Sequence, residues 1–166
     1  MRVARYGAGR TNQKFYFAKI AMQHSEQASD DASKQAHYEA AVFHLHGAFL
    51  AFLQELSRFY KLSAQLATTE AIRLALDAKG QISPEISQLQ MLEDGQWLGQ
   101  LQQVFATIQL AADPVEPQPE AELADSLIMR AAPIQEQPRF DMAQVQDWYK
   151  HLQRVMSEFR QEMVEF

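Results

Sequence analysis

The sequence predicts an all-α protein, a single-domain bundle of four or five helices with a long central second helix and a Pro-rich connector before the last helix. Apolar residues recur every three or four positions along most of the 166-residue chain, as they do in amphipathic helices. Start and stop signals flank these segments, and no stretch alternates apolar and polar residues as a half-buried strand would. The length suits one domain over residues 1–166, and 47% apolar residues are enough for one core.

The first helix is expected from about Asn12 to Ala28, with Thr11 as its N-cap. Within this segment, the residues that recur at helical spacing are Phe17, Ile20, Ala21, His24 and Ala28. The following segment, SDDASK, is expected to end the first helix and to start the second.

The second helix is expected to run from Asp30 and Asp31 to about Leu62, because Gly47 is the one Gly or Pro in that stretch. At 1.5 Å per residue such a helix is about 45 Å long, which makes it the spine of the fold. Its core stripe is expected to comprise Tyr38, Val42, Leu45, Phe49, Leu56 and Tyr60.

Shorter helical segments are expected downstream. One begins at Thr69 and stops at Gly80, because glycine is common just after a helix. Another has Ser83 as its N-cap and Pro84 at its first helical position. The segment around Gly95 is expected to break or bend this helix before WLGQLQQVFATIQLA resumes the helical pattern.

The last helix follows a segment of different composition. Residues 113–139 contain five prolines and, before residue 126, five acidic residues, so we expect an extended acidic connector. The helix behind it starts with Asp141 as N-cap, Gln144 in a capping box, and Phe140 with Val145 as a hydrophobic staple. Its apolar stripe is expected to comprise Val145, Trp148, Leu152, Val155 and Phe159.

Composition and spacing exclude or disfavour several kinds of site. The chain has no cysteine, which excludes thiol catalysis, disulfides and cysteine-bound metals. It lacks GxGxxG, GxSxG, Glu-x-x-His and His-x-x-x-His motifs, so we expect no cofactor, no metal and no catalytic residue. No apolar run is long enough to cross a membrane and no secretory signal is evident, so we expect a cytoplasmic location.

The segment AVFHLHGAFLAFL, residues 41–53, raises the question of what two histidines do in an apolar helix. Residues two apart point about 200° apart around an α-helix, so His44 and His46 cannot hold one metal ion. His44 shares a flank with Glu55, and His46 lies on the opposite flank. We expect all three to be buried polar groups with a structural role, because buried polar groups are nearly always paired.

Charge is distributed unevenly along the chain. The net charge is −6, yet residues 1–25 hold five basic residues and no acid, so the remainder carries −11. If the first two helices form a hairpin, the start of the first meets the end of the second. A small-anion or nucleotide site is then expected beside free backbone N–H groups, at a basic end formed by Arg10, Asn12, Lys14, Arg58 and Lys61.

A latch is the alternative interpretation of this basic end. In a latch, the cations pair within the chain with the acidic connector or with Glu158, Glu162 and Glu165. Exposed charges commonly serve such local pairing and solubility.

Three segments carry a resemblance to a known family. RTNQKFYFA, FHLHGAF and ELSRFYKL, residues 10–18, 43–49 and 55–62, resemble an uncharacterised family of small all-helical bacterial proteins. The resemblance covers mainly the first two helices. It implies a bacterial cytoplasmic protein without an established activity, and it transfers no catalytic residue.

Three functions remain open. The expected one is a non-enzymatic interaction module, a homodimer with an unknown protein partner, because Phe43 and Leu50 lie outside the core stripe of the second helix. The second is small-anion or nucleotide binding at the basic end. The third is a helical hydrolase or metalloprotein built from histidines of several helices, which no spacing favours. A membrane is not an expected partner, because no apolar run is long enough to cross one, and a nucleic acid is not expected, because the chain is acidic overall.

Overall fold

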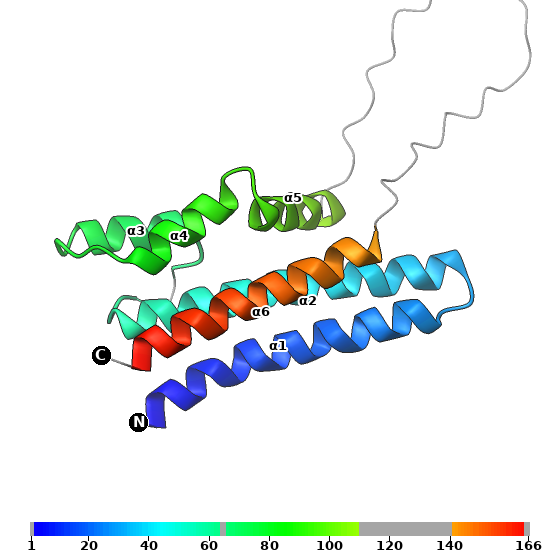
Figure 1. The fold of residues 1–166 in the computed structure, drawn as a ribbon, viewed down its shortest axis with the longest axis horizontal. Coiled ribbons are helices and arrows are strands. Elements are labelled where there is room, and N and C mark those ends of the chain that lie inside the picture. The colour runs from blue at the N-terminus through cyan, green and yellow to red at the C-terminus, as the bar shows by residue number, and fades with distance from the viewer. Residues whose placement is uncertain (1, 64–65, 110–140, 165–166) are drawn as a thin grey trace, which may run out of the picture.

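The computed structural model describes residues 2–63, 66–109 and 141–164, with side chains from residue 8 onward. These ranges are all-helical, as predicted, and contain six helices (Figure 1). The helices are α1 (Arg2–Gln27), α2 (Asp31–Phe59), α3 (Thr69–Asp77), α4 (Pro84–Glu93), α5 (Trp97–Gln109) and α6 (Met142–Val164). None of them is long and apolar enough to span a membrane.

The count of six differs from the four or five helices expected. The helical conformation is interrupted at Gly95, which has a φ of +76°. Helices α4 and α5 are therefore separate. The expected connector, residues 113–139, and Phe140 of the expected staple lie outside the described residues.

The first helix, α1, starts earlier than expected. It begins at Arg2 rather than near Asn12, and Thr11 is not an N-cap. Thr11 is fully buried within the helix, and its hydroxyl donates a hydrogen bond to Glu55 Oε1 of α2. A threonine just before an apolar segment is typical of a cap, but here its hydroxyl meets an acceptor on a neighbouring helix.

Helices α1 and α2 form an antiparallel hairpin. Asp30 caps α2 by accepting a 2.8 Å hydrogen bond from the Ser33 N–H, which confirms the predicted start. Near the turn, Ser25 Oγ donates to the Lys34 carbonyl at 3.0 Å. Helix α2 ends at Phe59 rather than near Leu62, since Lys61 adopts a left-handed φ of +53°.

Helix α2 lies in the middle of the molecule. Helices α1 and α6 run along it side by side, and α3, α4 and α5 form a second row on its other side (Figure 1). The predicted core stripe is buried except at Tyr60, which is half-buried. Phe52 and Leu53, outside that stripe, are also fully buried, because neighbours cover α2 on more than one side.

Helix α6 follows its predicted pattern. Asp141 Oδ1 accepts a 2.9 Å hydrogen bond from the Ala143 N–H, as an N-cap does. The whole predicted apolar stripe is buried, including Trp148, which is 2% exposed. Strict helical spacing of large apolar residues was therefore sufficient to identify the face that packs on α2.

Helices α3 and α4 pack against each other through Ile72, Leu76, Ile86 and Leu89, all buried. Thr68 caps α3, and Ser83 caps α4 with Pro84 in its first turn, as predicted for α4.

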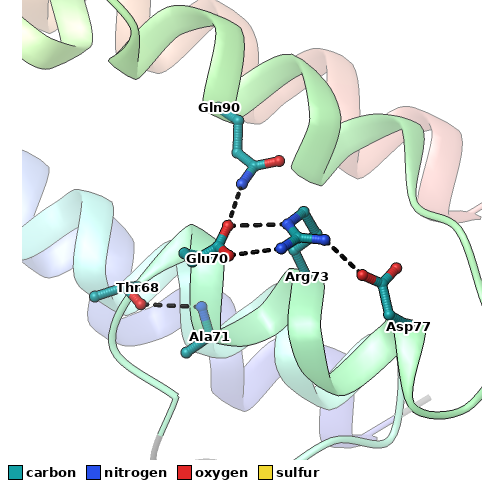
Figure 2. Close-up of polar contacts among 6 residues, drawn as sticks. All are labelled: Thr68, Glu70, Ala71, Arg73, Asp77 and Gln90. Atoms are coloured by element: carbon teal, nitrogen blue, oxygen red, sulfur yellow. Dashed lines mark hydrogen bonds and ion pairs between the residues drawn. The ribbon is translucent and has the colours of Figure 1, made fainter.

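Figure 2 shows the polar contacts on α3 and between α3 and α4. Arg73 pairs with Glu70 and Asp77 of its own helix, and Gln90 of α4 donates to Glu70 at 2.8 Å. These ion pairs are exposed and each contributes at most about 1 kcal/mol. The buried aliphatic residues therefore supply most of the stability of this helix pair.

Candidate functional site

A polar cluster joins α1, α2 and α6 within an otherwise apolar interface. The Glu55 side chain is only 9% exposed, and Arg160 reaches it from α6. Arg160 Nη2 donates to Glu55 Oε1 at 2.8 Å, and Nε donates to Oε2 at 3.1 Å. Thr11 donates to the same carboxylate, and Arg160 Nη1 donates to Asn12 Oδ1 at 3.1 Å. Both carboxylate oxygens are thus hydrogen-bonded, as a nearly buried carboxylate requires.

A cleft of about 300 Å³ opens beside this cluster, between α1 and α6. Three aromatic side chains line it: Phe15, Tyr16 and Tyr149. The Phe15 and Tyr149 rings meet edge to face with their centroids 5.1 Å apart. Burial raises the pKa of the Tyr149 phenol.

The polar lining of the cleft is cationic and neutral. Lys19 and Arg160 supply the cations, and Asn12, Gln153 and Ser157 supply neutral hydrogen-bonding groups. None of the described residues that line the cleft is acidic. Of the five residues expected at the basic end, Asn12 is the one that this cleft includes.

Arg10 and Lys14 lie on the other flank of α1. Arg10 Nη1 donates to Gln13 Oε1 at 2.6 Å. The Lys14 stem lies against Gly47, and its Nζ lies 5.2 Å from the centroid of the Phe43 ring. Partial burial, together with the charge of Arg10, lowers the pKa of Lys14.

The structure does not bring all the expected basic residues together. In the hairpin, His24 meets His37 and Lys14 lies on Gly47, so Arg10 is level with residue 51 of α2. Arg58 lies two further turns along α2, about 10 Å away along the axis. Lys61 lies beyond the end of α2, where its carbonyl accepts a hydrogen bond from Lys79.

The expected free N–H groups are also absent from this region. Because α1 begins at Arg2, residues 10–14 lie inside the helix, where backbone N–H groups bond to carbonyls one turn earlier. The expectation of free helix-start N–H groups beside Arg10 and Lys14 is therefore wrong.

The two histidines of the apolar helix are packed against aromatic rings. His44 contacts Phe17 of α1 and Phe43, with centroids 5.2 and 5.4 Å apart, and His46 stacks on Phe105 of α5 at 3.8 Å. Burial lowers the pKa of both, and the charges of Lys14 and Arg10 lower that of His44 further. Both imidazoles lie at helix seams, where the lowered pKa favours the neutral form.

His44 is half-buried, and its Nδ1 has no hydrogen-bond partner within the described ranges. In the same ranges, no three His, Asp or Glu residues lie close enough together to hold a metal ion.

The ion pair that crosses between helices differs from the predicted latch. Within the described residues, Glu158 and Glu162 form no ion pair with Arg10 or Lys14, while Glu165 and the connector lie outside those residues. The acid of the observed pair is Glu55, and its base is Arg160.

Sequence reasoning missed Arg160, Lys19 and Tyr149. The available signal was Glu55, a carboxylate among apolar residues, which needs a cation from another helix. The pattern does not say which cation, because Glu55 and Arg160 are 105 residues apart in the chain.

Comparison with known proteins yields a family and no individual relative. The sequence model of a family of unknown function, DUF6586, matches residues 6–166. No curated protein and no solved structure matches the chain. The matched segment includes both flanks of α1 described above.

Proposed function

The chain belongs to DUF6586, a family of unknown function, and from this premise we propose that it is a non-enzymatic interaction module that binds an acidic segment of a partner protein. The proposed contact is the basic–aromatic surface, which we define as Arg10, Lys14 and Phe43. We retain two further expectations: the chain forms a single helical-bundle domain, and the protein acts in a bacterial cytoplasm.

The observation that carries the proposal is a pair of cations without a carboxylate. Arg73 and Arg160 both meet acidic side chains, whereas Arg10 and Lys14 form no ion pair within the described residues. They stand one turn apart on α1, and their mutual repulsion contributes to the lowered pKa of Lys14. An acidic partner would relieve this local repulsion, even though the chain as a whole carries a net charge of −6.

Phe43 supplies an apolar anchor beside the two cations. Its side chain is 46% exposed, and its ring lies 6.3 Å from that of Phe105 on α5. Buried aromatic and arginine side chains dominate the energies of many protein interfaces. The partner segment should therefore combine acidic residues with a large apolar residue.

The test uses a labelled synthetic peptide of glutamates with a central phenylalanine, whose binding is followed by fluorescence anisotropy. The variant Arg10→Gln/Lys14→Gln should bind about tenfold more weakly, since each exposed ion pair contributes roughly 0.7 kcal/mol. The control Lys34→Gln/Lys150→Gln removes the same charge from exposed positions elsewhere and should bind like the wild type.

Two results would contradict the proposal. One is peptide binding that is equally strong in both double variants, because the attraction would then come from overall charge alone. The other is self-association: if light scattering shows a dimer that Phe43→Ser converts to a monomer, the occupant of this surface is a second copy of the chain.

A further inference from the structure

The cleft between α1 and α6 lies on the opposite flank of α1 from the basic–aromatic surface and shares no residue with it. We propose that the cleft between α1 and α6 binds a small organic anion that carries an aromatic ring. Arg160 and Lys19 bind the anionic group, and the rings of Phe15, Tyr16 and Tyr149 contact the aromatic part of the ligand.

Arg160 is prepared for this role by the polar cluster behind it. Its guanidinium has five N–H donors, of which Glu55 and Asn12 take three within the described residues. One N–H on each terminal nitrogen remains for a ligand. Because the bidentate contact with Glu55 already fixes the side chain, a ligand would lose little binding energy to ordering it.

The charge balance of the cleft selects an anion of low charge. Glu55 neutralises Arg160, while Lys19 is exposed and forms no ion pair within the described residues. The cleft therefore carries about one unbalanced positive charge. A carboxylate, with one negative charge, fits this balance, and a phosphate monoester, at about −1.5 to −2 near pH 7, carries up to about one negative charge more. Both accept hydrogen bonds from a planar guanidinium.

The size and the walls of the cleft select the rest of the ligand. Ligand pockets commonly measure roughly 300–1,000 Å³, so a cleft of about 300 Å³ suits a single ring with its anionic group. Tyr16 is 61% exposed at the rim, whereas Phe15 is 8% exposed and lies deeper. Asn12 and Gln153 add hydrogen-bonding groups that would orient the ligand.

The test is an NMR titration of the full chain with benzoate and phenyl phosphate, compared with acetate, inorganic phosphate and benzyl alcohol. Each aromatic anion should bind at least about tenfold more tightly than the matching probe that lacks the ring or the charge. The backbone signals of Asn12 and Ser157 should shift on binding, and those of Lys14 and Phe43 should not.

Two variants test whether Lys19 contacts the anionic group of the ligand. Lys19→Gln should weaken phenyl phosphate binding about fivefold, in line with one partly exposed ion pair, and Lys150→Gln on the solvent face of α6 should leave it unchanged. Neither change touches the cluster around Glu55, so loss of the fold does not confuse the result. Lys19→Gln should also leave binding of the acidic peptide unchanged, which separates this proposal from the proposed function.

Several outcomes would overturn the cleft proposal. They are an absence of shifts at millimolar probe, shifts centred on Phe43, equal binding of acetate and benzoate, or equal binding by Lys19→Gln and the wild type.

Discussion

The polar cluster of Glu55 and Arg160 permits a quantitative test of the packing of α6. We expect Arg160→Met to lower the free energy of unfolding by about 2–3 kcal/mol. Breaking a buried ion pair by removing one partner costs roughly 3–5 kcal/mol, and an exposed pair contributes at most about 1 kcal/mol. Glu55 is 9% exposed and Arg160 is 29% exposed, so this pair lies between the limits, nearer the buried one.

The residual charge on Glu55 is the physical cause of that loss. In Arg160→Met, the carboxylate keeps only the hydrogen bond from Thr11 while α6 still covers it. In Glu55→Gln/Arg160→Met the group is neutral and needs no counter-charge. The double variant should therefore be more stable than Arg160→Met by about 1 kcal/mol or more.

Urea unfolding followed by circular dichroism at the helix band measures these differences. Arg154→Met is the matched control, because Arg154 is exposed on α6 and, within the described residues, its hydrogen bond is with His151 of its own helix. It should change stability by less than about 0.5 kcal/mol. The reasoning is refuted if Arg160→Met costs no more than this control, or if the double variant is less stable than Arg160→Met.

Further predictions concern two glycines and a histidine. Gly47→Ala should raise stability by up to about 1 kcal/mol, because alanine favours helix and the atoms nearest its Cβ belong to the flexible end of Lys14, at 3.3 Å; a melting temperature below that of the wild type would contradict this. Gly99→Ala should destabilise by several kcal/mol, because its Cβ would lie 2.1 Å from the backbone oxygen of Glu93, and near-wild-type thermal unfolding would contradict it. The pKa of His44 is lowered in the fold by burial and neighbouring cations, so the unfolded chain binds protons first, and stability should fall as the pH drops below about 6.5. His44→Gln should reduce this slope in unfolding curves at several pH values, and an unchanged slope would remove His44 as its source.

Some features of this protein follow from local sequence. The caps at Ser83 and Asp141 and the start of the second helix at Asp30 were identified correctly, because an N-cap hydrogen bond joins residues two or three apart. The buried stripe of α6 was also identified, since helical spacing alone places those side chains on one face.

Local signals misled at the start of α1. Thr11 has the residue type and the position of a cap, and its burial depends on Glu55 of another helix. The segment FHLHGAF raised the question of a site by its composition, and a structural role was expected for its two histidines. In the structure its histidines pack against rings from α1 and α5, and Gly47 makes room for the Lys14 stem.

The sequence by itself therefore determined the all-α class, most helix boundaries and the apolar faces, all of which depend on neighbours within about two helical turns. Tertiary structure alone decided which polar groups meet. The register of α1 on α2 separates Arg10 from Arg58, and the docking of α6 brings Arg160 to Glu55 and forms the cleft lined by Lys19. The register and docking of helices depend on side-chain packing over whole interfaces. These interfaces join residues far apart in the chain, so no short segment of the sequence predicts them.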